Sequence, residues 1–125
     1  DYTAHGTAVN LAARLEAANK ALGTTICVSG ATRARIEGAA LRPAARLIVR
    51  GHAEPVDVFT TLPEGATDAQ TEAWSAAYVA VATGAPEARA MLIELRTTWS
   101  DDPLVALHLK RLDAGARDAV IDLRS

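Results

Sequence analysis

Residues 63–67 (PEGAT) separate two kinds of apolar pattern. Before them, short runs rich in Val, Ile and Thr alternate with stretches of helical period, which predicts a sheet combined with helices. After them, apolar residues recur every three or four positions, which predicts helices. The expected fold class is therefore α/β (α+β) over residues 1–62, followed by a linker at 63–68 and an all-helical extension over 69–125.

The first part of the chain predicts the order strand, helix, strand, helix, strand, strand. Gly23 and Gly38 follow runs of helical period, so each is expected to end a helix. Such an order predicts a sheet with its helices on one side, a sandwich of the ferredoxin-like kind that lacks its first strands. The predicted strands cover 1–3, 25–28, the second half of 41–49 and 56–61, and the predicted helices cover 7 or 8 to 22 and about 30–36.

The second part predicts three helices. Thr67 or Asp68 is expected to cap the first, because short polar side chains accept hydrogen bonds from the free N–H groups of a first turn. Residues 119–123 read either as a short strand or as an extended tail. The predicted helices cover 69–83, 86–99 and 103–112.

The spacing of Trp74, Ala90 and Pro103 resembles a single degenerate tetratricopeptide repeat. One repeat cannot bury its own apolar face, so the helices are expected to dock on the first part of the chain or on a second subunit. Trp74, Tyr78 and Trp99 are expected to form their core. The role of the helices stays open between covering a face of the first part and binding a protein partner.

The charge balance argues against nucleic-acid binding, because 13 basic residues are outnumbered by 15 acidic ones. The single cysteine, Cys27, cannot form an intramolecular disulfide, which favours a reducing, cytoplasmic compartment. No apolar run approaches the roughly 18 residues of a spanning helix, although an anchor upstream of Asp1 would not be visible. The chain begins inside a motif and without Met, so we expect a fragment of a longer protein.

Residues 1–14 (DYTAHGTAVNLAAR) predict the end of a strand, a loop and the first turns of an amphipathic helix. Asn10 and Arg14 are four residues apart, so they share one helix face. An amide can donate to a sugar or leaving oxygen, and a guanidinium can bind a phosphate through two N–H groups. The pair is therefore a candidate ligand site on a rigid support. The opposite face is apolar and consists of Val9, Leu11, Ala12, Leu15 and Ala18.

These residues form the pattern DYT-x-x-G-x-x-VN-x-A-x-RLE, which resembles the second half of the catalytic domain of class III nucleotide cyclases. Residues 49–52 (VRGH) are similar to the VKGK-type segment of that family. The resemblance covers residues 1–62 and implies a ferredoxin-like cyclase sandwich that is incomplete at its N-terminus. It implies an enzyme that converts ATP or GTP into a 3′,5′-cyclic nucleotide and pyrophosphate.

The resemblance also implies roles for single residues. Asn10 and Arg14 match the transition-state residues, with Asn10 holding the ribose and Arg14 meeting charge on the α-phosphate. Arg50 stands where the family has a lysine that contacts the terminal phosphates. Thr3 matches a position that recognises adenine, which favours ATP over GTP and hence an adenylate cyclase of intracellular signalling. The implied substrate-binding residues are Asp1, Thr3, Ala4, Val9 and Arg50.

The family segments that carry two metal-binding aspartates do not occur in the sequence. The resemblance therefore implies two Mg²⁺ or Mn²⁺ ions held by aspartates outside this chain, and predicts that the chain by itself is inactive. Its partner is expected to be a second copy in a homodimer, or the N-terminal half of the same catalytic domain. Two alternatives stay open: a nucleotide-binding pseudocyclase with a regulatory role, and a scaffold that acts through the helices. His5 and His108 lack partners at metal-ligand spacing and are expected to be structural or solvated.

Overall fold

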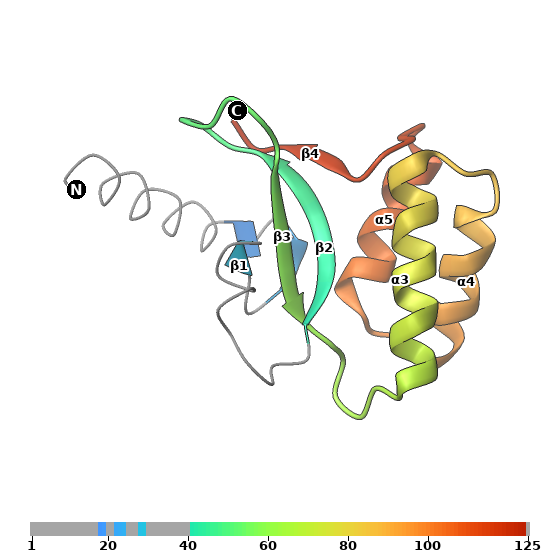
Figure 1. Ribbon diagram of the computed structural model, residues 1–125. Helices are drawn as coiled ribbons and strands as arrows, with labels where there is room; N and C mark the ends of the chain where they lie inside the picture. Colours follow the sequence, from blue (N-terminus) through green and yellow to red (C-terminus); the bar gives the residue numbers. More distant parts are fainter. Residues whose placement is uncertain (1–17, 20–21, 25–27, 30–40, 125) are drawn as a thin grey trace.

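The computed structural model describes residues 18–19, 22–24, 28–29 and 41–124 of the chain. In this part a four-stranded sheet is covered on one side by three helices (Figure 1). The predicted mixed α/β class is therefore confirmed. The strands are β1 (Val28–Ser29), β2 (Leu41–Ile48), β3 (Val56–Thr61) and β4 (Val120–Asp122), and the helices are α3 (Asp68–Thr83), α4 (Ala88–Thr98) and α5 (Pro103–Asp113).

The strand order in the sheet is β1-β3-β2-β4. Strand β3 pairs antiparallel with β1 and with β2, whereas β4 pairs parallel with β2. The strands predicted within 41–49 and at 56–61 are confirmed as β2 and β3, which pair as a hairpin with its turn at residues 49–55. The helix predicted at 30–36 lies outside the described residues, as does most of the strand predicted at 25–28.

Strand β2 begins earlier than the sequence predicts. Strand structure was expected only from the middle of this segment, but Leu41 already pairs with Thr61 of β3. Proline cannot donate to a β-ladder, and Pro43 is accommodated because the register shifts between Pro43 and Ala45. Ala44 consequently has no Cα partner in β3, which is the geometry of a β-bulge.

Helix α3 begins within one residue of its predicted start and ends at its predicted residue. The Thr67 side chain accepts a hydrogen bond from the Gln70 N–H, and the Gln70 side chain accepts one from the Thr67 N–H. This capping box satisfies two N–H groups that have no partner within the helix. At the other end Gly84 has φ +72°, a left-handed conformation that favours glycine.

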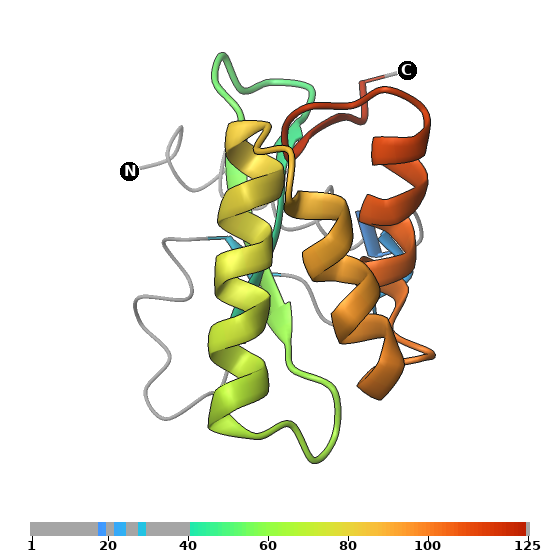
Figure 2. The same ribbon diagram turned by 90° about the vertical axis from the view of Figure 1, so that its right-hand side faces the viewer.

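Helices α4 and α5 also lie close to their predicted ranges. The Asp102 side chain caps α5 by accepting a hydrogen bond from the Val105 N–H at 3.1 Å, and Pro103 occupies the first turn. Helix α4 contacts both α3 and α5. Figure 2 shows the three helices side by side in front of the sheet.

The end of the chain corrects one expectation, because residues 69–125 are not all helical. Val120–Asp122 form β4 at the edge of the sheet. The Arg46 N–H donates to the Ala119 carbonyl, and the Leu123 N–H donates to the Ile48 carbonyl, each at 2.9 Å. Of the two interpretations left open for this segment, the short strand is correct.

The sheet and the helices share one apolar core. Trp74 and Trp99 are buried in it and Tyr78 packs against it, so their predicted core role is confirmed. Leu47 and Val58 contribute from β2 and β3. Full burial of a side chain of this kind stabilises a fold by about 1.5–3 kcal/mol, so the helices bind the sheet through this apolar face. The division of the chain into two domains stays a prediction.

Candidate functional site

Arg50 is the predicted site residue that lies in the described part of the chain. The catalytic assignments therefore stay predictions. His5 and Cys27 also lie outside the described residues. The predicted site residues outside the described ranges are Asp1, Thr3, Ala4, Val9, Asn10 and Arg14.

The predicted catalytic helix, from residue 7 or 8 to 22, is described at its C-terminal end. Ala18, which belongs to its predicted apolar face, is buried. Gly23 has φ +74°, and the Thr24 N–H donates to the Asn19 carbonyl at 3.0 Å. A bond of this span beside a left-handed glycine is the Schellman ending, so Gly23 ends the helix as predicted.

Arg50 lies in the turn of the β2–β3 hairpin, and its side chain is exposed. Its Nη2 group donates a hydrogen bond to the Arg124 carbonyl at 2.8 Å. Gly51 follows with φ +90°, and the His52 N–H donates to the Val49 carbonyl at 3.3 Å. The turn therefore presents a cation to solvent beside the end of β4.

The charge of Arg50 has no carboxylate partner among the residues that the structure describes. Hydrogen bonds from Arg124 lower the pKa of Asp122 to about 2, so that aspartate is occupied by a different arginine. An arginine whose charge is not neutralised by a carboxylate remains available to an anion such as a phosphate. The arginines that do pair with aspartates are Arg42 with Asp102, Arg46 with Asp57, Arg89 with Asp113, Arg111 with Asp118 and Arg124 with Asp122.

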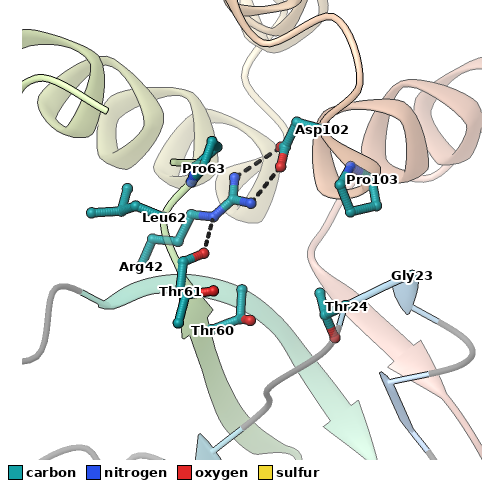
Figure 3. A pocket seen from close by; sticks show the side chains of 9 residues that line it. All are labelled: Gly23, Thr24, Arg42, Thr60, Thr61, Leu62, Pro63, Asp102 and Pro103. Atoms are coloured by element: carbon teal, nitrogen blue, oxygen red, sulfur yellow. Dashed lines mark hydrogen bonds and ion pairs between the residues drawn. The ribbon is translucent and has the colours of Figure 1, made fainter. Parts of the chain in front are cut away.

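A second polar site lies inside the protein, between β2 and the start of α5 (Figure 3). Arg42 Nη1 donates to Asp102 Oδ2 at 2.8 Å, Nη2 donates to Oδ1, and Nε donates to the Thr61 carbonyl at 3.1 Å. The guanidinium carbon lies 4.7 Å from the ring centre of Trp74 and 5.4 Å from that of Trp99. The buried charges therefore have hydrogen-bond partners and aromatic neighbours.

A hollow of about 240 Å³ lies beside this ion pair, and Thr24 and Pro103 are among the residues that line it. A Cβ atom added to Gly23 would lie 2.8 Å from the Pro103 Cβ. The end of the predicted catalytic helix thus approaches the start of α5 so closely that only glycine fits. Since both carboxylate oxygens and all three guanidinium nitrogens already have partners, the ion pair has a structural role.

The β-bulge provides two further contacts between the sheet and the helices. Trp74 Nε1 donates to the Pro43 carbonyl at 2.9 Å, and His108 Nε2 lies 2.8 Å from the Ala44 carbonyl. Because a carbonyl can only accept, Nε2 carries the hydrogen and Nδ1 accepts from Arg111 Nη1 at 3.1 Å. Burial lowers the pKa of His108 to about 4, so the ring is neutral at pH 7. Its predicted structural role is confirmed.

Sequence reasoning missed the Arg42–Asp102 pair. The predicted helix over 103–112 has Asp102 directly before it, where an acidic side chain is favourable. The partner is 60 positions away along the chain, and no local pattern relates two residues at that separation. Only the burial of both side chains at the same point of the core reveals the pair.

The outer side of the helices carries a shallow hollow of about 270 Å³ between the start of α3 and the end of α4. Ala73, Met91 and Leu95 contribute apolar atoms to it, and Gln70 and Glu94 contribute polar ones. No bound chain or charge pattern indicates an occupant. The hollow therefore does not decide between a covering role and a binding role for the helices.

Among the described residues, no group of three or more His, Cys, Asp or Glu side chains is placed to hold a metal ion. No helix in that part of the chain is long and apolar enough to cross a membrane. Comparisons with profiles of protein families, with curated proteins and with solved structures found no match. The resemblance to class III cyclases therefore rests on the motif residues themselves.

Proposed function

We propose that this chain is the C-terminal half of a class III adenylate cyclase catalytic domain, which converts ATP into 3′,5′-cyclic AMP and pyrophosphate. The observation that carries the proposal is a pair of motifs in the family's order. VN-x-A-x-R supplies Asn10 and Arg14, and VRGH supplies Arg50. The exposed position of Arg50 in a hairpin turn, without a carboxylate partner among the described residues, supports its part in the proposal.

The proposed fold is the ferredoxin-like cyclase sandwich, with earlier strands supplied from outside this chain. Antiparallel pairing of β3 with both β1 and β2 is compatible with it. The parallel strand β4 and the helices α3, α4 and α5 would then be an addition that covers one side of the sheet.

In the proposed reaction, the ribose 3′ oxygen attacks the α-phosphorus and pyrophosphate leaves. The protein's task is to align these groups and to stabilise the charge that grows on the phosphate oxygens. Asn10 would hold the ribose, and Arg14 would donate to the α-phosphate oxygens. Arg50 would bind the terminal phosphates, and Thr3 would contact adenine.

The proposed metal ions do not fit the described residues, which provide no cluster of ligands. Two Mg²⁺ or Mn²⁺ ions would activate the 3′ hydroxyl and bind the triphosphate, and their aspartates would come from the N-terminal half of such a domain. That half would belong to a second subunit or to the same polypeptide.

The test is cyclic AMP production from ATP by the full-length protein that contains this chain, measured with Mn²⁺ and with Mg²⁺. Arg14→Ala is expected to lower kcat by about 10²–10³-fold, the usual cost of losing one donor to a developing charge. Arg46→Ala is the matched control, because Arg46 is an exposed arginine paired with Asp57 at the surface. It is expected to change kcat less than twofold.

A full-length protein that binds ATP but forms no cyclic nucleotide would replace this proposal with the pseudocyclase. A protein that neither binds nor converts ATP would refute both. Deleting residues 67–125 is a poor test of the scaffold alternative, because α3 and α5 share a buried core with the sheet. Val79→Glu is a better one, since Val79 is 58% exposed and its replacement leaves that core intact.

A further inference from the structure

Arg50 is held in place by a backbone oxygen from the far end of the chain. Its Nη2 group donates to the Arg124 carbonyl at 2.8 Å, and the two residues are 74 positions apart. We propose that β4 and the Arg124 carbonyl are a positioning device that orients the Arg50 guanidinium for the terminal phosphates of the substrate. This inference rests on the proposed function, because it assumes that Arg50 binds those phosphates.

The first support is the attachment of the chain end to β2. Ile48 of β2 is in register with Asp122 of β4, and the Leu123 N–H donates to the Ile48 carbonyl at 2.9 Å. The residue after Leu123 is Arg124, and the residue two positions after Ile48 is Arg50. Parallel pairing therefore carries the end of the chain to the turn between β2 and β3 (Figure 1), where the Arg124 carbonyl meets Arg50.

The second support is the way in which Arg124 itself is held. Its backbone N–H and its Nε each donate to Asp122 Oδ1, at 2.9 Å and 3.0 Å, and its Nη2 donates to Asp122 Oδ2 at 2.8 Å. The bond from the backbone N–H restricts the backbone of Arg124, and hence the direction of its carbonyl, without needing the Arg124 side chain. The two side-chain bonds pair the Arg124 charge, so it does not compete with Arg50 for an anion.

The third support is the chemical nature of the Arg50 contact. A carbonyl is neutral, so it orients the guanidinium and leaves its charge in place, whereas an aspartate would neutralise that charge. A guanidinium has five N–H donors, and the bond to Arg124 uses one of them. The others remain for phosphate oxygens. A long side chain that is oriented in advance loses less conformational freedom on binding, and this raises affinity.

The experiment compares three single variants and one double variant of the full-length protein with the natural sequence. Leu123→Pro removes the N–H that binds the Ile48 carbonyl and so releases the end of β4. Arg124→Ala is the matched control, because it keeps the carbonyl and removes only the side chain. Arg50→Ala removes the cation itself. The measurements are the Kd of inorganic triphosphate by titration calorimetry, and kcat and KM for ATP.

Leu123→Pro is expected to raise the Kd of inorganic triphosphate, and the KM for ATP, about three- to tenfold, as expected for loss of one hydrogen bond to a charged group near the surface. Its kcat is expected to stay within twofold, whereas partial unfolding would lower kcat and the calorimetric stoichiometry. Arg124→Ala is expected to change Kd less than twofold. In the double variant Arg50→Ala/Leu123→Pro, the proline is expected to add nothing to the effect of Arg50→Ala.

Two results would overturn the inference alone. One is an unchanged Kd in Leu123→Pro while Arg50→Ala weakens binding, which would leave the proposed function of Arg50 intact. The other is a proline effect of the same size in the presence and absence of Arg50, which would show that β4 does not act through this side chain. If Arg50→Ala itself left Kd and KM unchanged, the phosphate-binding role of Arg50 would fail, and the inference with it.

Discussion

Breaking the buried Arg42–Asp102 pair is expected to destabilise the protein severely. Arg42→Met leaves the Asp102 carboxylate, whose side chain is 3% exposed, without its guanidinium partner. Loss of one partner from a buried pair costs about 3–5 kcal/mol, because the other charge stays buried. With a urea dependence of about 1–3 kcal/mol per M, the unfolding midpoint falls by about 2 M. Fluorescence can follow the transition, since Trp74 and Trp99, the two tryptophans of the chain, both lie beside Arg42.

The control for this experiment is Arg89→Met. Arg89 also pairs with an aspartate, Asp113, at 2.9 Å, but the two side chains are 55% and 57% exposed. Exposed pairs contribute about 0–1 kcal/mol, so the midpoint should hardly move. A double variant, Arg42→Met with Asp102→Asn, leaves no buried charge and keeps an N-cap side chain, so it should recover much of the lost stability. Equal midpoint shifts for Arg42→Met and Arg89→Met would refute the reasoning.

Two further predictions concern His108 and Gly84. The pKa of His108 is about 4 in the folded protein against 6.5 ordinarily, so its contribution to stability is complete above pH 6.5 and is lost as the pH falls through 4. Urea unfolding at a series of pH values should show a loss of about 3 kcal/mol from this group. His108→Gln, whose amide can still donate to the Ala44 carbonyl, should make the free energy of unfolding depend less steeply on pH. An unchanged pH dependence would contradict this. Gly84→Ala should cost about 1–2 kcal/mol for the left-handed backbone, and more because the added Cβ would lie 3.0 Å from the Arg117 carbonyl. Gly65→Ala is the control, because Gly65 has a similar φ of +77° and no atom lies within 4 Å of the added Cβ. Equal losses of stability in thermal unfolding for the two variants would show that the contact with Arg117 adds nothing.

Arg50 shows how much of the candidate site the sequence could predict. The predicted strands within 41–49 and at 56–61 leave Arg50 between them, and the structure places it in the exposed turn that joins β2 and β3. Its contact with Arg124 could not be predicted in this way, because it depends on the pairing of β4 with β2. A three-residue strand has too little pattern of its own to reveal its neighbour in a sheet.

The bulge in β2 is the second feature that the sequence did not predict. The strand was predicted only over the second half of 41–49, whereas β2 begins at Leu41 and contains the bulge. In the structure the carbonyls of Pro43 and Ala44 at the bulge accept hydrogen bonds from Trp74 and His108. Those side chains come from helices that follow β3 in the sequence, so the carbonyls at the bulge gain these partners only when the helices pack on the sheet.

Local sequence was sufficient for the features whose partners lie within a few residues. Thr67 and Gln70 cap α3, Asp102 caps α5, and Gly23 and Gly84 end helices, because each satisfies backbone groups of its own turn. Packing of the helices on the sheet decided the rest. A polar group that is buried must find a hydrogen-bond partner, and the partner is whichever group the fold brings beside it, at any distance along the chain.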